Sequence, residues 1–371
     1  MNNDKIIIAM EDYLKENRIQ EFIEYCNNNK VPEVYELYNQ SLVIDNEEEK
    51  KNIYDKIIIS CKNMQRKMGM DSKINNDFLY INTLNKQINL TNNIETKIDL
   101  YTQLARKYRF LIFSVGMEFR EKAIKAYKIL LKLSESSGDY KIMMEAYGGL
   151  GRSIKLSKKE EDLLLAIDYF EKELNIAKKY FSIEIETERS SNMEICFRDL
   201  SKIVAENDKK KEYLEKGLNM SLKYLEIADK KEMRGEYANK CNNIAEFYFL
   251  LSLINDKEEI VNILDLSYKY YKQAYRYWLG VNWDGIGVSL LGISDVLLEK
   301  SNCIKNSTFI SEGIEMAENS VSLYKKLGNQ YSEGYGYSIL SEFYKIDKKF
   351  DESKKYIRLK EKIEKKLGIE I

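Results

Sequence analysis

The stretch YKKLGNQYSEGYGYSILSEFYK, residues 324–345, decides the fold class of this chain. Its apolar residues recur at helical spacing, yet it also holds Gly334, Gly336, Ser338 and Ser341, which are mediocre helix formers. Small residues on an otherwise regular helix mark places where a neighbouring helix passes close by, because large side chains would hold the two helices apart. The stretch therefore predicts a helix that other helices cross at its glycines and serines.

The same signals recur along the chain. KKLG at 325–328 returns as KKLG at 365–368, and a glycine at a helix end can take the left-handed conformation that stops the helix. From about residue 138 onward, breaks follow one another at intervals of 40 to 53 residues, which leaves room for two antiparallel helices between them. We expect an all-α fold with helix pairs over 99–137, 140–180, 184–229, 231–280, 283–327 and, for the last pair, 330–346 with 351–367.

A short residue pattern also recurs in these pairs. A large apolar residue stands beside a small one on the first helix, and a small residue follows on the second helix, beginning at Leu104-Ala105, Leu150-Gly151, Ile244-Ala245, Leu291-Gly292 and Leu340-Ser341. This pattern resembles the tetratricopeptide (TPR) repeat over about three-quarters of the chain. The resemblance implies a right-handed superhelical solenoid of about six TPR-like helix pairs, with repeats longer than the roughly 34-residue consensus.

The first 95 residues look different from the rest. Asparagine is dense there, and the periodicity predicts helices near 3–16, 18–28, 32–44, 47–68 and 75–89, with Pro32 in a first turn. We expect residues 1–95 to form an N-terminal helical subdomain, or degenerate repeats that cap the solenoid. The TPR-like repeat domain would then occupy residues 96–371.

Composition narrows the classes of protein. The 59 basic and 60 acidic side chains give a net charge of −1, which is not the electrostatic footprint of a dedicated nucleic-acid binder. The longest near-apolar run, residues 247–254, is far short of the roughly 18 residues that span a bilayer. The five cysteines are widely spaced without a CxxC pair, as in proteins of a reducing compartment. We expect a cytoplasmic protein without a membrane or nucleic-acid partner.

Charge is also uneven between the two ends. The first 60 residues carry an excess of acidic side chains, whereas residues 345–366 carry an excess of basic ones. Ends of opposite sign would allow copies of the chain to associate head to tail as a homo-oligomer. Solvated helix faces are the simpler explanation, and we favour it.

The chain contains no histidine, which excludes every mechanism that needs an imidazole from this chain as base, relay or metal ligand. Chemistry based on lysine, carboxylate or tyrosine remains open. GGLGRS at 148–153 lacks the GxxxxGK[ST] spacing of a phosphate-binding loop and follows no strand. We therefore expect a protein that is not an enzyme, with no catalytic residues, no metal site and no cofactor.

The TPR resemblance also implies where a partner would bind, namely on the inner wall formed by the first helices of the pairs. Taken position by position, it gives Arg106, Arg109, Phe110, Arg152, Lys155, Asn239, Asn242, Glu246, Ser289, Ile293, Tyr335, Ser338 and Glu342. Asparagine can pair with the backbone of an extended peptide, and arginine with a carboxylate. The leading hypothesis is a non-enzymatic adaptor that binds a peptide or a partner protein in a concave groove.

A second resemblance suggests an alternative function. EFIEYCNNNKVPEVYELYNQSLV at 21–43, followed by IIISCKNMQRK at 57–67, is similar to the region after the DNA-binding domain of arbitrium-type receptors. The layout as a whole looks like the peptide-sensing regulators of Gram-positive bacteria and their phages, which include the Rap-type proteins. This resemblance implies a regulator that a signalling peptide controls. No helix-turn-helix pattern precedes the similar stretch, so DNA binding is not carried over.

Overall fold

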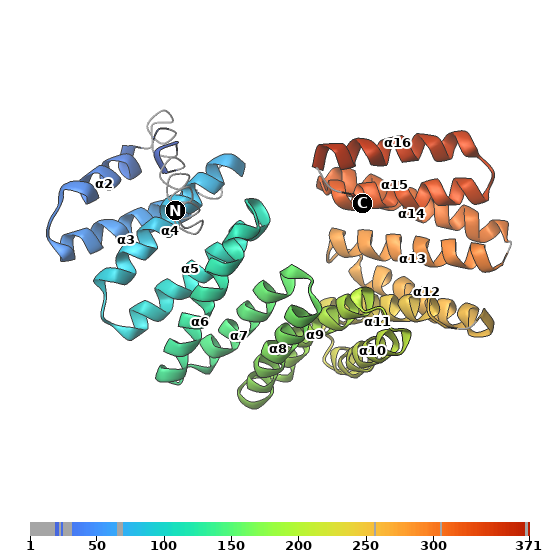
Figure 1. Cartoon of the computed structure of the whole chain (residues 1–371), viewed down its shortest axis with the longest axis horizontal. Helices are drawn as coiled ribbons and strands as arrows, with labels where there is room; N and C mark the ends of the chain where they lie inside the picture. Colours follow the sequence, from blue (N-terminus) through green and yellow to red (C-terminus); the bar gives the residue numbers. More distant parts are fainter. Residues whose placement is uncertain are drawn as a thin grey trace. The chain divides into compact units, whose positions relative to one another are not determined.

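The computed structural model describes residues 19–21, 24, 32–64, 70–255, 257–304, 306–367 and 370–371. These residues form α-helices and two short 3-10 helices, and the described part of the chain contains no β-strand. The helices pack into two compact units, Met1–Ser157 and Lys158–Ile371. Within each unit, successive helices lie side by side (Figure 1). The predicted all-α class is confirmed.

The first unit is a stack of helices in which each contacts the next along the chain. Its elements are α2 (Pro32–Val43), α3 (Glu47–Met64), α4 (Met70–Leu90), α5 (Ile94–Ser114), η1 (Met117–Phe119), α6 (Arg120–Ser137), α7 (Tyr140–Ile154) and η2 (Lys155–Ser157). Helix α2 begins at Pro32, as the sequence predicts, because a proline at the first helical position loses no helical hydrogen bond. One apolar cluster joins α2, α3, α4, α5 and the start of α6, with Leu79 and Leu104 almost completely buried.

The second unit continues the same arrangement. Its helices are α8 (Glu160–Tyr180), α9 (Ile183–Ile203), α10 (Asn207–Lys230), α11 (Arg234–Ser252), α12 (Lys257–Trp278), α13 (Trp283–Cys303), α14 (Ser307–Leu327), α15 (Gln330–Ile346) and α16 (Phe350–Leu367). Each helix again contacts the next. The four helix pairs expected from residue 184 onward are confirmed as α9–α10, α11–α12, α13–α14 and α15–α16.

The division between the units falls inside one of the expected pairs. The pair over 140–180 corresponds to α7 and α8, and the boundary lies after Ser157, between these two helices. The expected subdomain limit at residue 95 lies instead in the first turn of α5. A distinct N-terminal subdomain over 1–95 stays a prediction. The helices expected over 3–16 and 18–28, and the glycine expected to end the last helix at 368, lie largely or wholly outside the described residues.

Short turns between helices follow directly from the local sequence. Gly138 and Gly328 end α6 and α14 in the left-handed region, with φ of 71° and 70°. The next residue in each case, Asp139 or Asn329, accepts a hydrogen bond from a backbone N–H of the following helix. A left-handed glycine followed by an N-cap residue thus reverses the chain within two residues. The role predicted for the glycine of the first KKLG is confirmed.

The glycines inside helices are the points of closest approach. Gly336 on α15 lies against Val321 of α14, and Gly334 lies against Ile371. Gly292 of α13 likewise lies against the ring of Tyr271 from α12. A methyl group at any of these positions would overlap the neighbouring side chain, so the helices could not approach as closely. The crossing role predicted for Gly336 is confirmed, whereas the close neighbour of Gly334 is the side chain of Ile371, which lies beyond the end of α16.

Contacts between alternate helices show which helices line the inside of the second unit. The first helices of successive pairs, α9, α11, α13 and α15, each contact the next one in this series, whereas the second helices show no comparable contacts in the described chain. In a curved stack of hairpins, the helices that approach one another are those on the inner side. We call the surface formed by α9, α11, α13 and α15 the A-helix face.

Candidate functional site

Ion pairs join the first two helices of the A-helix face. Glu246 on α11 accepts hydrogen bonds from two cations of α9: Arg198 Nη1 lies 2.9 Å from Glu246 Oε2, and Lys202 Nζ lies 2.9 Å from Glu246 Oε1. All three side chains are partly exposed. The burial of Glu246 acts to raise its pKa, but the two cations outweigh that effect, so its pKa lies below the usual range.

Hydrogen bonds continue this row across the next two helices. Ser289 of α13 donates to Asn242 Oδ1 of α11 over 2.9 Å. Tyr335 of α15 donates to Asp295 Oδ2 of α13, also over 2.9 Å. Polar contacts therefore link each helix of the face to the next, from α9 to α15.

The far end of this row carries an unusual carboxyl group. Burial raises the pKa of Asp295 to about 7, although the hydrogen bond from Tyr335 opposes the shift. Burial also raises the pKa of the Tyr335 phenol, and the nearby Asp295 adds to this shift. A carboxyl group held in this way gains from a cationic partner, because a positive charge would favour its ionised form. The face thus offers cations on α9 and a carboxyl group on α13.

Four of the predicted cationic site residues belong to the first unit, and three of them lie around Tyr127. Arg106 of α5 forms a two-pronged ion pair with Glu145 of α7, with one N···O distance of 2.5 Å. Arg109 and Arg152 flank Tyr127 of α6; burial raises the pKa of this phenol, and the two guanidinium charges oppose the shift. Lys155 begins η2 directly after α7. Arg106 is therefore already paired within its own unit, and the charges of Arg109 and Arg152 act on a buried phenol of that unit.

The structure places the remaining predicted residues in the second unit. Asn242, Glu246 and Tyr335 belong to the polar row, while Asn239 lies one turn earlier on α11, with its amide 3.4 Å from Glu236. The structure thus brings the predicted residues together in two groups, one in each unit. The expectations that Ser289 and Ile293 line the surface are wrong, because both side chains are fully buried. Ile293 lies in the apolar core, and the Ser289 hydroxyl bonds within the protein.

Sequence reasoning missed three residues of the row: Arg198, Lys202 and Asp295. The small-residue pattern is weak in the third helix pair, around Cys196. The repeat pattern therefore points to no site residues on α9. Asp295 lies three residues after Gly292, just outside the positions to which the repeat pattern points. Their signal was their spacing, since Arg198 and Lys202 stand four residues apart and so share one face of a helix.

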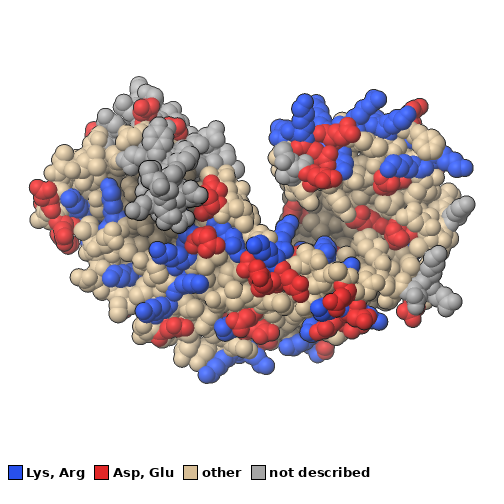
Figure 2. Space-filling model, viewed as in Figure 1, with Lys and Arg blue, Asp and Glu red and all other residues tan. Residues whose placement is uncertain are grey.

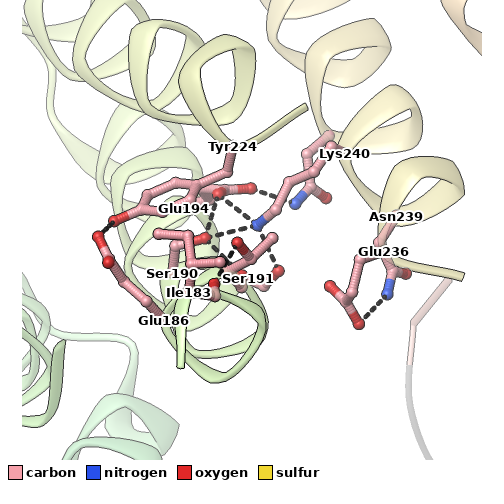
Figure 3. Close-up of polar contacts among 11 residues, drawn as sticks. Ile183, Glu186, Ser190, Ser191, Glu194, Tyr224, Glu236, Asn239 and Lys240 are labelled. Atoms are coloured by element: carbon pink, nitrogen blue, oxygen red, sulfur yellow. Dashed lines mark hydrogen bonds and ion pairs between the residues drawn. The ribbon is translucent and has the colours of Figure 1, made fainter. Parts of the chain in front are cut away.

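Directly beside the A-helix face lies a buried polar cluster between α9 and α11 (Figure 3). Lys240 Nζ donates to Glu194 Oε1 over 2.6 Å and to the hydroxyls of Ser190 and Ser191 over 2.7 Å. Asn243 donates to the other oxygen of Glu194, also over 2.6 Å. Lys240 and Glu194 are both inaccessible to solvent. Because every charged atom of this pair has partners, the cluster fixes the position of α11 on α9.

Other kinds of site are not evident in the part of the chain that is described. No group of three or more cysteine, aspartate or glutamate side chains there could hold a metal ion. None of the described helices is long and apolar enough to cross a membrane. Acidic and basic side chains are interspersed over the face in view, and basic ones gather over α16 (Figure 2).

The architecture has clear counterparts among solved structures. The chain is similar to a signal transduction ATPase with numerous domains from Pyrococcus horikoshii that carries a tetratricopeptide-repeat sensor, with a TM-score of 0.55 and 15% identity. The match covers 95% of this chain and 53% of that one, so the chain spans about half the length of that protein. This likeness shows the fold, and the predicted resemblance to TPR proteins is confirmed.

Peptide-sensing regulators are also among the structural neighbours. The apo form of RapI matches with a TM-score of 0.49 and 12% identity, over 85% of this chain and 98% of that one. The apo form of the quorum sensor NprR from B. thuringiensis matches with a TM-score of 0.43 and 16% identity, over 96% and 99% of the two chains. No protein-family model and no curated protein sequence matches the chain.

Proposed function

We propose that the A-helix face of the second unit binds an extended peptide segment, and that the protein works as a non-enzymatic adaptor. The observation that carries this proposal is the set of polar contacts that links each helix of the face to the next, from Arg198 and Lys202 on α9 to Tyr335 on α15. A segment lying across four helices could meet such a row along its whole length. Repeat scaffolds commonly bind partners on the concave side.

The row also specifies the chemistry of the ligand. Arg198 and Lys202 would pair with a carboxylate, either an acidic side chain or a free C-terminus. Asn239 and Asn242 each carry an amide donor and acceptor that suit a peptide backbone. At the other end, Asp295 would pair with a basic side chain or an amino terminus. The expected ligand is therefore a peptide with acidic and basic groups at opposite ends.

The ion pairs of α9 support a second function. A peptide carboxylate that bound Arg198 and Lys202 would replace Glu246, and one of the links between α9 and α11 would be lost. Such an exchange would couple peptide binding to the packing of the repeats, as in a regulator controlled by a signalling peptide. A change in the radius of gyration on peptide addition, measured by small-angle X-ray scattering, would distinguish this regulator from a rigid adaptor.

The test is a binding screen with a library of fluorescein-labelled octapeptides that place an acidic group at one end and a basic group at the other. We expect binding to the wild type and a loss of about 10-fold or more in affinity for Arg198→Ala, because a charge-assisted hydrogen bond is removed. Asp295→Asn should weaken binding of these octapeptides, and it should leave unchanged the binding of versions in which a neutral residue replaces the basic group.

Lys216→Ala is the matched control. Lys216 lies on α10 of the same unit, where it pairs with Glu212, and its side chain is about half exposed. Loss of this cation should leave the affinity unchanged. If no octapeptide binds, or if Lys216→Ala weakens binding as much as Arg198→Ala, the assignment of the A-helix face is wrong.

A further inference from the structure

The first unit has a recess of its own, formed by residues other than those of the A-helix face. Two adjoining cavities of about 300 Å³ and 370 Å³ lie along α5 between α4 and α6. They share Tyr101 and Ile129, so together they form one continuous groove. Each cavity is within the size range of ligand pockets in proteins. We call this recess the α5 groove.

The floor of the α5 groove is apolar and aromatic. Tyr101, Leu104 and Tyr108 of α5 are spaced by three and four residues, so they form one stripe along the helix. Arg106, which pairs with Glu145, stands on the opposite side of this helix, two residues from Leu104. The α5 groove therefore lies on a different surface from the predicted cation group of the first unit.

The two walls of the groove carry polar groups of different kinds. Asn85 on α4 and Asn89 at the end of the same helix are four residues apart and provide amides along one wall. Lys122 and Lys125 on α6 are three residues apart and provide ammonium groups along the other. Residues at these spacings are neighbours on a helix surface, so each wall presents a short row of one chemical type.

The electrostatic character of the groove is one-sided. Lys97 lines the second cavity, so three lysines border the groove in all, and no aspartate or glutamate is among the described residues that line either cavity. Lys122 also lies over the ring of Phe119, 5.4 Å from its centroid, which holds the ammonium group at the groove edge. A chain with nearly balanced charge thus has a local surface that favours an anionic ligand.

We propose that the α5 groove binds an acidic peptide segment of a partner protein, in which acidic and apolar side chains alternate. The lysines of α6 and Lys97 would pair with the carboxylates, the amides of α4 with the peptide backbone, and the floor with the apolar side chains. The apolar floor and the amide wall favour a peptide over a phosphate chain, because phosphates would leave both unused. This inference does not depend on the function proposed for the A-helix face.

The experiment uses the full chain and fluorescein-labelled hexapeptides in which glutamate alternates with leucine or phenylalanine, measured by fluorescence anisotropy. We expect binding that weakens at high salt. Lys122→Glu with Lys125→Glu should lower the affinity by about 10-fold or more, because both carboxylate partners are reversed in sign. Hexapeptides in which lysine replaces glutamate should not bind.

The matched control is Lys128→Glu with Lys132→Glu. Both lysines are exposed on α6 but do not line the groove, and this double variant changes the net charge by the same amount. Its affinity should stay within about twofold of the wild type. If the groove variant does not fold by circular dichroism, Lys125→Gln replaces it, with an expected loss of about threefold to tenfold.

Three results would overturn the proposal. The first is that no acidic hexapeptide binds to the full chain. The second is that the two double variants lose affinity equally, which would mean that net charge, and not the position of the lysines in the groove, determines binding. The third is that ATP or inorganic phosphate displaces the hexapeptide completely at equal concentration, which would make the groove a site for small anions.

Discussion

Lys240 Nζ lies 2.6 Å from Glu194 Oε1, and both side chains are completely shielded from solvent. This ion pair joins α11 to α9 beside the row of polar contacts on the A-helix face. Two charges removed from water are stable only when both are paired and their remaining donors and acceptors are satisfied. Here Ser190, Ser191 and Asn243 complete the set.

Breaking this pair should destabilise the fold strongly. Lys240→Met leaves Glu194 charged and buried, so we expect the free energy of unfolding to fall by about 3–5 kcal/mol. Urea denaturation followed by circular dichroism measures the loss. Lys240→Met combined with Glu194→Gln should lose less than the sum of the two single variants, because no unpaired charge remains. Additive losses would show that the two side chains do not act as a pair.

Glycines at the helix crossings should contribute to the stability of the fold, whereas glycines with open space around them should not. Gly292→Ala places a methyl group against the rigid ring of Tyr271, so we expect a loss of about 1–3 kcal/mol in thermal or chemical unfolding. Gly235→Ala is the control, since Gly235 is in the first turn of α11 with open space around it. That substitution should leave stability unchanged or raise it by up to about 1 kcal/mol. Equal losses would refute the close-packing explanation.

Asp295 should make stability depend on pH in the direction opposite to that of most carboxylates. Its folded pKa of about 7 lies above its ordinary value of 3.8, so the folded state binds the proton more tightly than the unfolded state. Ionisation of Asp295 therefore destabilises the folded state increasingly as the pH rises from about 4 to 7. Above about pH 7 this destabilisation has reached its full size. Asp295→Asn should therefore raise the free energy of unfolding by about 1–3 kcal/mol near pH 8.

The same substitution should have much less effect near pH 3, below both pKa values, where the wild-type carboxyl is largely protonated in both states. Thermal melts of the two proteins across this pH range provide the check. A stability difference that stays constant with pH would mean that Asp295 titrates normally.

Glu246 should compete with an acidic ligand for the cations of α9. Glu246→Gln removes the carboxylate that holds Arg198 and Lys202, so octapeptides with an acidic end should bind about threefold to tenfold more tightly. The free energy of unfolding should fall by about 1–2 kcal/mol at neutral pH, because charge-assisted hydrogen bonds are lost. Weaker peptide binding would instead mean that Glu246 itself contacts the ligand.

Much of the fold could be predicted from local signals. The glycine and N-cap pairs at Gly138-Asp139 and Gly328-Asn329 place two helix boundaries, because the left-handed conformation and the capping side chain act within a few residues. Apolar periodicity then gives the limits of the four helix pairs from residue 184 onward to within a few residues. Gly336 of α15 also identifies a helix crossing, because a side chain of any size there would prevent the close approach of α14.

For the candidate site, the sequence predicted some of the residues, and the tertiary structure alone revealed their partners. The sequence by itself placed Asn242, Glu246 and Tyr335 on the first helices of their pairs, since the repeat pattern fixes which face each position takes. Only the tertiary structure showed that Arg198 and Lys202 meet Glu246, that Asp295 meets Tyr335, and that Lys240 and Glu194 are buried together. Such pairings join residues some 40 to 50 positions apart, and their distances, burial and pKa shifts exist only once neighbouring repeats have packed.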